Sequence, residues 1–129
     1  MIKDQFNINV FSNDAMFCTS LATECNKYGF NLNFYEDDDI GSDELIETSL
    51  VSVNIIDLDT KDFDYLKAAK KLRITSNLPI FGVFRTFNKS LAAKAEKSGF
   101  DLVFTKSMLI KSIKRVIIHI SDEKKTFKK

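Results

Sequence analysis

Two residues of opposite charge follow apolar segments and are the strongest candidates for chemistry in this sequence. Asp57 ends the segment VSVNIID, and Lys106 follows DLVFT. A carboxylate at such a position is a potential cation ligand, and at about 4 Å it attracts an ammonium group by roughly 4 kcal/mol at an effective dielectric constant near 20, before desolvation is subtracted. We therefore expect Asp57 to pair with Lys106 or with Arg85, which follows another apolar segment, LPIFGVF.

Five β-type segments alternate with helical patterns, and these elements must position the charges. Strands are expected at 6–11, 31–36, 51–57, 78–84 and 101–105. Helices are expected from the turn at 12–14 to about residue 28, near 42–48, up to about residue 73, near 88–98 and over 108–120. Residues 1–121 then form one domain, and the polar residues 122–129 form a basic tail, frayed, or the start of a linker.

This alternation predicts an α/β fold, a doubly wound five-stranded parallel sheet with helices on both faces. In such folds the working crevice lies beyond the carboxyl ends of the strands. The segments that meet there are Ser12 to Asp14, Asp57 to Thr60, Phe84 to Thr86 and Thr105 to Ser107.

The remaining sequence features favour a cytoplasmic protein. No apolar stretch approaches the roughly 20 residues that span a bilayer, and the first residues do not resemble a signal peptide. Cys18 and Cys25 lie on one expected helix, about 10 Å apart, too far for a disulfide. The only histidine, His119, has no cluster of metal-ligand residues around it, and no nucleotide-binding motif is present.

The segments around Asp57 and Lys106, together with LPIFGVF and SGFDLVFTKS, resemble a response-regulator (CheY-like) receiver domain across essentially the whole chain. The resemblance implies the (βα)5 flavodoxin-like receiver fold. It also implies that Asp57 occupies the position that accepts a phosphoryl group from a histidine kinase, and that Lys106 would pair with that group. In this family an acidic pair after the first strand holds Mg²⁺, and a threonine or serine after the fourth strand binds the phosphoryl oxygen.

Several pocket positions depart from the family pattern. The acidic pair falls on the neutral Ser12 and Asn13, whose simplest interpretation is a helix N-cap. Asp57 would then be the main anionic ligand of a weakly bound Mg²⁺, with Asp14 and Asp59 helping through water. We therefore expect no cofactor, and Mg²⁺ only if Asp57 is a working phosphoacceptor.

The positions that transmit phosphorylation in the family also differ. The hydroxyl position after the fourth strand falls on Phe84, and the small residue beside it falls on Arg85. The switch aromatic on the fifth strand falls on Val103, and the usual proline after the lysine falls on Ser107. Together these departures predict a pseudo-receiver.

Three functions follow from this interpretation, in descending order. The first is a non-enzymatic signalling module that binds a protein partner, a C-terminal effector domain or a second copy through its last two helices and fifth strand, where the basic residues are Lys89, Lys94, Lys97, Lys111, Lys114 and Arg115. The second is a phosphoacceptor response regulator in which a histidine kinase phosphorylates Asp57.

The third function is nucleic-acid binding through the basic half of the chain. Residues 1–64 hold 3 Lys/Arg and 14 Asp/Glu, a balance of −11, whereas residues 65–129 hold 16 and 4, a balance of +12. Two differently charged solvated sides explain this asymmetry more simply. No recognised nucleic-acid motif is present, so this function ranks last.

Overall fold

A computed structural model describes residues 7–35, 52–59, 65–75 and 78–127 of the chain. Its five strands form one parallel sheet in the order β2-β1-β3-β4-β5. They are β1 (Asn7–Phe11), β2 (Asn31–Tyr35), β3 (Ser52–Asp57), β4 (Ile80–Phe84) and β5 (Leu102–Thr105). The helices are α1 (Ala15–Lys27), α2 (Tyr65–Thr75), α3 (Lys89–Lys97) and α4 (Lys106–Phe127).

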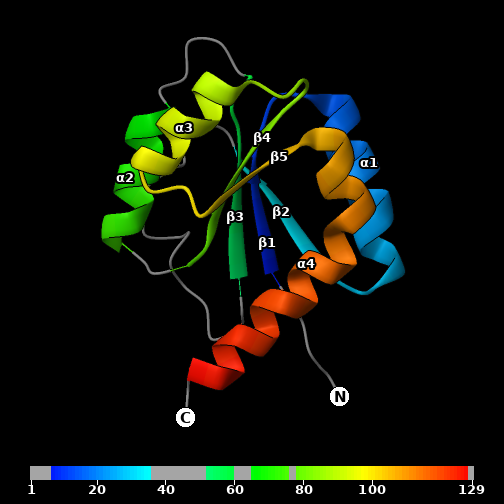
Figure 1. Cartoon of the computed structure of the whole chain (residues 1–129). Helices are drawn as coiled ribbons and strands as arrows, with labels where there is room; N and C mark the ends of the chain where they lie inside the picture. Colours follow the sequence, from blue (N-terminus) through cyan, green and yellow to red (C-terminus); the bar gives the residue numbers. More distant parts are fainter. Residues whose placement is uncertain (1–6, 36–51, 60–64, 76–77, 128–129) are drawn as a thin grey trace.

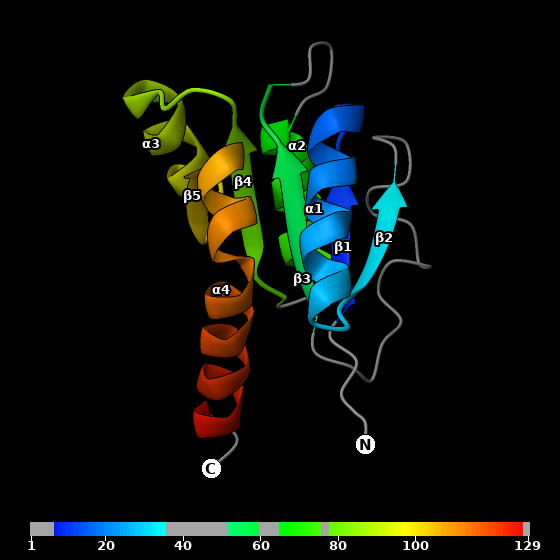
Figure 2. The same ribbon diagram turned by 90° about the vertical axis from the view of Figure 1, so that its right-hand side faces the viewer.

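The helices cover both faces of the sheet (Figures 1 and 2). α1 and α4 pack on one face, where Phe17, Leu21 and Ile113 join the inward side chains of the strands. α2 and α3 pack on the other, around Phe84 and Phe100. This is the doubly wound architecture expected from the alternation of elements, and its strand order reverses between β1 and β3, the place where such folds bind their ligands at the strand ends.

Four polar residues are buried in the described part of the chain: Asn9, Asn54, Asp57 and Lys106. The two asparagines face each other on neighbouring strands, and the Asn9 Nδ2 donates to the Asn54 Oδ1 at 3.1 Å. Asp57 ends β3 and Lys106 begins α4 directly after β5. The two buried charges therefore lie at the carboxyl edge of the sheet.

The strands occur where the apolar segments predict them, but the last helix was predicted too short. It begins at Lys106, not 108, and continues to Phe127, where the sequence suggested an end at 120 and a frayed tail. The segment SDEKKTF contains no glycine or proline, and its glutamate and lysines favour helix. The expected helix near 42–48 lies outside the described residues.

Both cysteines are free thiols, as their spacing on α1 predicted. Cys25 is buried in the α1–α4 core, and this burial raises the pKa of its thiol to about 12. Cys18 is half-buried, and desolvation likewise raises the pKa of its thiol. In the described part of the chain, no helix is long and apolar enough to cross a membrane.

Candidate functional site

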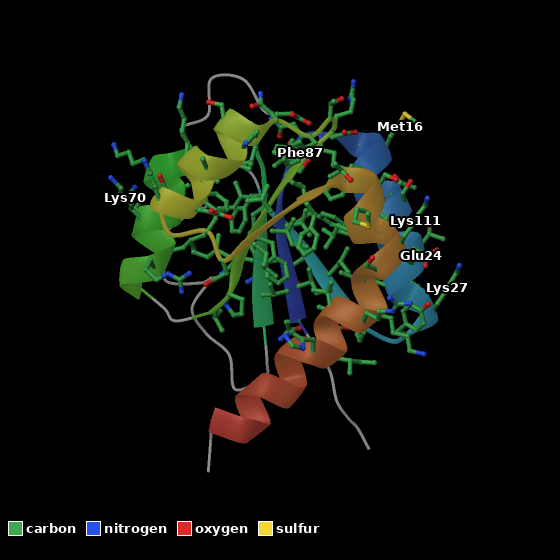
Figure 3. The ribbon with its side chains drawn as sticks, viewed as in Figure 1. Met16, Glu24, Lys27, Lys70, Phe87 and Lys111 are labelled. Carbon is green, nitrogen blue, oxygen red and sulfur yellow. The ribbon has the colours of Figure 1, made fainter. Side chains whose placement is uncertain are left out.

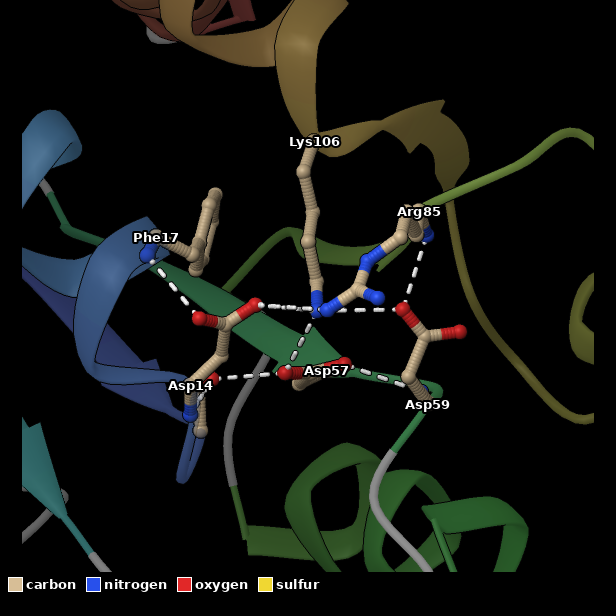
Figure 4. A network of polar contacts seen from close by, with 7 residues as sticks. Asp14, Phe17, Asp57, Asp59, Arg85 and Lys106 are labelled. Carbon is tan, nitrogen blue, oxygen red and sulfur yellow. Dashed lines mark hydrogen bonds and ion pairs between the residues drawn. The ribbon is translucent and has the colours of Figure 1, made fainter.

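The ammonium group of Lys106 lies at the point where three carboxylates converge (Figure 4). Its Nζ is 3.0 Å from Asp14 Oδ2, 3.1 Å from Asp57 Oδ2 and 3.0 Å from Asp59 Oδ2. The lysine side chain is only 10% exposed. We call these four residues the lysine cage; it joins the ends of β1, β3 and β5.

Asp57 is the most enclosed member of the cage, with a side chain 2% exposed. Its Oδ2 accepts a hydrogen bond from the Ser12 hydroxyl at 2.6 Å and contacts the Lys106 ammonium. Its Oδ1 accepts one from the backbone N–H of Asp59 at 2.8 Å. Both carboxylate oxygens therefore already have donors, and the expected pair with Lys106 is present.

Asp14 caps α1, a role that the sequence interpretation assigned to Ser12 and Asn13. Its Oδ1 accepts from the backbone N–H of Phe17 at 3.1 Å, while Oδ2 contacts Lys106. The Phe17 N–H and the Lys106 ammonium together lower the pKa of the Asp14 carboxyl. Ser12 instead accepts from the Asp14 N–H at 3.0 Å, and Asn13 is exposed.

Asp59 ties the cage to the end of β4. Its Oδ2 accepts from the backbone N–H of Arg85 at 2.7 Å as well as contacting Lys106. The Arg85 side chain is 80% exposed, and its guanidinium lies 3.9 Å from Asp14 Oδ2. Arg85 therefore contacts Asp14 and not Asp57, so of the two expected cations it is Lys106 that pairs with Asp57.

The electrostatics of the cage favour a permanently charged lysine. Burial alone would lower the pKa of Lys106, but hydrogen bonds to Asp14, Asp59 and Asp57 outweigh it and raise that pKa. The ammonium thus supplies the positive charge that three converging carboxylates require.

A magnesium ion does not fit this donor set while Lys106 occupies it. Mg²⁺ binds oxygen at 2.0–2.1 Å in an octahedron and keeps several waters. The cage oxygens lie 3.0–3.1 Å from a nitrogen, which is the spacing of ammonium–carboxylate hydrogen bonds. Among the described residues, no group of three or more His, Cys, Asp or Glu is arranged to hold a metal.

The two positions associated with switching are part of the α2–α3 core. Phe84 is 1% exposed, and its ring meets Phe87 edge to face at a centroid distance of 5.8 Å. Val103 packs, half-buried, against the same cluster. Phe84 therefore fills the core at the position where the receiver pattern has a threonine or serine.

The basic residues chosen as a partner surface are all exposed but do not share one face. Lys114 lies over the ring of Tyr28 at the end of α1, 5.3 Å from its centroid. We use the name basic face for the other five cations, which lie on α3 and α4, the two helices that flank the edge strand β5: Lys89, Lys94, Lys97, Lys111 and Arg115.

Changing Asp14 to asparagine is expected to remove an acid-sensitive part of the stability. Asparagine can still cap α1, so the change isolates the charge. Because folding lowers the pKa of Asp14 below 3.8, its contribution is present above pH 3.8 and is lost as pH falls through the folded value. Urea unfolding of wild type and Asp14→Asn should therefore differ most near neutral pH and converge in acid, once Asp14 is protonated in the folded state as well; a difference constant with pH would contradict this.

The contribution of Lys106 has the opposite sign of pH dependence. Its raised pKa means that the stabilisation is fully present below pH 10.5 and is lost as pH rises through the folded value. Over the whole neutral range both charges are therefore in place, and the cage stays closed.

Sequence reasoning found the Asp57–Lys106 pair but missed the direct contacts of Asp14 and Asp59 with the same ammonium. It placed both carboxylates near the pocket as water-mediated helpers. Their place in the sequence could have indicated these contacts, because each carboxylate lies within three residues of a strand end. Parallel strands bring such positions to one edge.

Solved structures with the same fold include several receivers. A two-component response regulator from Clostridium difficile is 17% identical, with a TM-score of 0.73, and the match covers 90% of this chain and 98% of that chain. A CheY-like response regulator receiver domain protein from Methanospirillum hungatei is 13% identical, with a TM-score of 0.74 and coverage of 95% and 98%. The beryllofluoride-activated NtrC4 receiver domain dimer is 15% identical, with a TM-score of 0.65 and coverage of 81% and 93%.

At these identities the likeness shows the fold. The chain has the five-stranded receiver fold that the resemblance implied. No family model and no curated protein sequence matches the chain.

Proposed function

We propose that this chain is a signalling module of the receiver type that acts by protein–protein contact and not as an enzyme. In this proposal Asp57 is held by Lys106 and does not serve as a Mg²⁺-dependent phosphorylation switch. The fold that the chain shares with a two-component response regulator and with a CheY-like receiver domain protein supports a role in two-component signalling. The free thiols of Cys18 and Cys25 are in keeping with a cytoplasmic location.

One observation carries the proposal: the nucleophilic oxygens of Asp57 are already engaged. Phosphorylation of a carboxylate needs an approaching phosphodonor and positive charge to offset the two anions. Asp57 is 2% exposed, and donors from Ser12, Asp59 and Lys106 surround its oxygens. A donor could reach it only after the cage opened, at the expense of these contacts.

The alternative is a phosphoacceptor response regulator with an unusual pocket. It is favoured by the pairing of Asp57 with Lys106 at 3.1 Å, the same two residue types that the resemblance assigns to phosphoryl acceptance. It requires Mg²⁺ and a phosphoryl group to displace Ser12 and Lys106 from Asp57. Phe84 and Val103, packed in one core, offer no hydroxyl to follow the phosphoryl group.

The basic face fits an acidic protein partner better than a second copy. Its five cations are all exposed and come from α3 and α4, which both contact the edge strand β5. Two copies that met through this face would bring like charges together, which costs several kcal/mol at close range. An acidic partner domain would be attracted instead, and its binding would weaken with salt.

The experiment is an amide NMR comparison with and without beryllofluoride and Mg²⁺, in wild type and Asp57→Asn. Because the cage leaves Asp57 no free oxygen, we expect small shifts that are the same in both proteins. Large shifts across α3, β5 and α4 that the Asp57→Asn change abolishes would contradict the proposal. The phosphoacceptor alternative would then replace it.

A further inference from the structure

Helices α2 and α3 are joined at their carboxyl ends. The guanidinium of Arg73, in the last turn of α2, donates to the backbone carbonyl of Gly99 at 2.8 Å. Gly99 follows the end of α3 by two residues. The two helices also pack small residues, Ala69 and Ala95 among them, into one cluster on the same face of the sheet. Their outer sides therefore lie next to each other (Figure 1).

Three exposed lysines lie beside this junction. Lys70 is three residues before Arg73 and so shares its side of α2. Lys94 and Lys97 share one side of α3 for the same reason, and Lys97 lies two residues before Gly99. Figure 3 shows Lys70 on the outer side of the molecule. We call these three lysines the α2–α3 lysine surface.

The positive charge of this surface has no counterpart in the part of the chain that the structure describes. There, no carboxylate lies within ion-pair distance of any of the three ammonium groups. The nearby Asp101 carboxylate pairs with Arg73 at 2.8 Å and accepts from the Ile80 N–H at 2.7 Å. Lys67 and Lys71 of α2 are exposed as well, but each has an interaction of its own. The three lysines are therefore available to carboxylates of a partner.

The charge pattern fits an acidic protein segment better than a nucleic acid. Glu96 lies between Lys94 and Lys97 in the sequence and is exposed, and the side chain of Asp101 is 47% exposed. The continuous phosphate backbone of a nucleic acid would meet these carboxylates as well as the lysines. Separate acidic side chains of a protein can contact the lysines and avoid the carboxylates.

We propose that the acidic partner of this chain contacts α2 as well as α3, with Lys70, Lys94 and Lys97 at the centre of the contact. Carboxylates of the partner pair with these three lysines, so the partner extends from the basic face over the outer side of α2. The inference rests on the proposed function, because it names where a protein partner binds.

The test is an amide NMR titration of the full chain with a peptide of about twelve glutamates, at about 50 mM salt, where charges are weakly screened. We expect the shifts to centre on α2 and α3, with a dissociation constant below about 1 mM. Lys70→Glu and Lys97→Glu should each raise that constant about fivefold, because each change replaces an attraction by a repulsion. The charge-matched control is Lys114→Glu on α4, where Lys114 lies over the ring of Tyr28. It should leave the constant within about twofold.

A second probe separates an acidic protein from a nucleic acid. An oligothymidylate of similar length should bind more weakly than the peptide at the same salt concentration, and tighter binding would overturn the proposal. So would a peptide that does not bind up to about 1 mM, shifts confined to β5 and α4, or equal effects of Lys70→Glu and Lys114→Glu. The beryllofluoride comparison is made without peptide, so it tests the proposed function separately.

Discussion

Replacing Lys106 by methionine is expected to lower the free energy of unfolding by about 3–5 kcal/mol. Methionine keeps the length of the side chain but removes the charge, and Asp14, Asp57 and Asp59 then lose the ammonium that all three contact at 3.0–3.1 Å. Asp57 is affected most, because it is buried and lies beside two other carboxylates. Urea unfolding at neutral pH measures the change.

The matched control is Lys27→Met on the outer side of α1. Lys27 also forms an ion pair, with Glu24 at 2.9 Å, but its side chain is 59% exposed (Figure 3). Exposed pairs contribute little, so the unfolding midpoint of this variant should hardly move. Equal effects at Lys27 and Lys106 would show that the cage contributes no more than an ordinary surface pair.

Lys106→Arg separates charge from geometry in the same assay. Arginine restores a cation, but its planar fork cannot direct donors to three converging carboxylates as the compact ammonium does. We expect its stability to lie between those of wild type and Lys106→Met. The loss in Lys106→Met should also be larger than that in Asp14→Asn, because the latter leaves two of the three cage contacts of Lys106 in place.

Much of the fold could be predicted from local patterns. The segments VSVNIID and LPIFGVF are nearly continuous apolar runs, as strands covered on both faces must be. The alternation of such runs with helical patterns is consistent with few topologies. The strand order observed, with β3 at the centre, is one of these few topologies.

The end of α4 could not be found in the same way. Apolar periodicity stops at Ile120, and the following residues are polar. Helical propensity and the absence of a breaker carry the helix on to Phe127. Apolar periodicity indicates only which side of a helix is buried, so it gives no signal where a helix extends beyond the core.

The residues of the lysine cage also differ in how well the sequence predicts their contacts. The sequence places Asp57 and Lys106 at strand ends, and the pairing of these two could be anticipated. The positions of Asp14 and Asp59 depend on helix capping and on the turn after β3, where Asp59 donates its N–H to Asp57. Such local hydrogen bonds aim a side chain but leave no periodic trace in the sequence.

The partner surface expected on the last two helices and the fifth strand also depended on information that the sequence lacks. Residue types alone suggested a surface suited to either a partner or a second copy. The five exposed cations of the basic face favour an acidic partner, whereas Lys114 lies over the ring of Tyr28. The exposure of Met16, Phe87 and Met108 was not anticipated from the sequence.

A Mg²⁺ titration tests most directly whether the Lys106 ammonium takes the place of a metal ion at this site. Calorimetry on wild type should show no saturable binding up to millimolar Mg²⁺, because the Lys106 ammonium already occupies the point where the three carboxylates converge and Ser12 and Asn13 supply no charge. In Lys106→Met the three carboxylates lose the cation that they share, and Arg85 remains near Asp14 alone. Mg²⁺ should then bind and restore stability, by about 2.7 kcal/mol at a concentration 100 times the dissociation constant. Saturation of wild type well below millimolar Mg²⁺, or a Lys106→Met variant that ignores Mg²⁺ altogether, would contradict the claim.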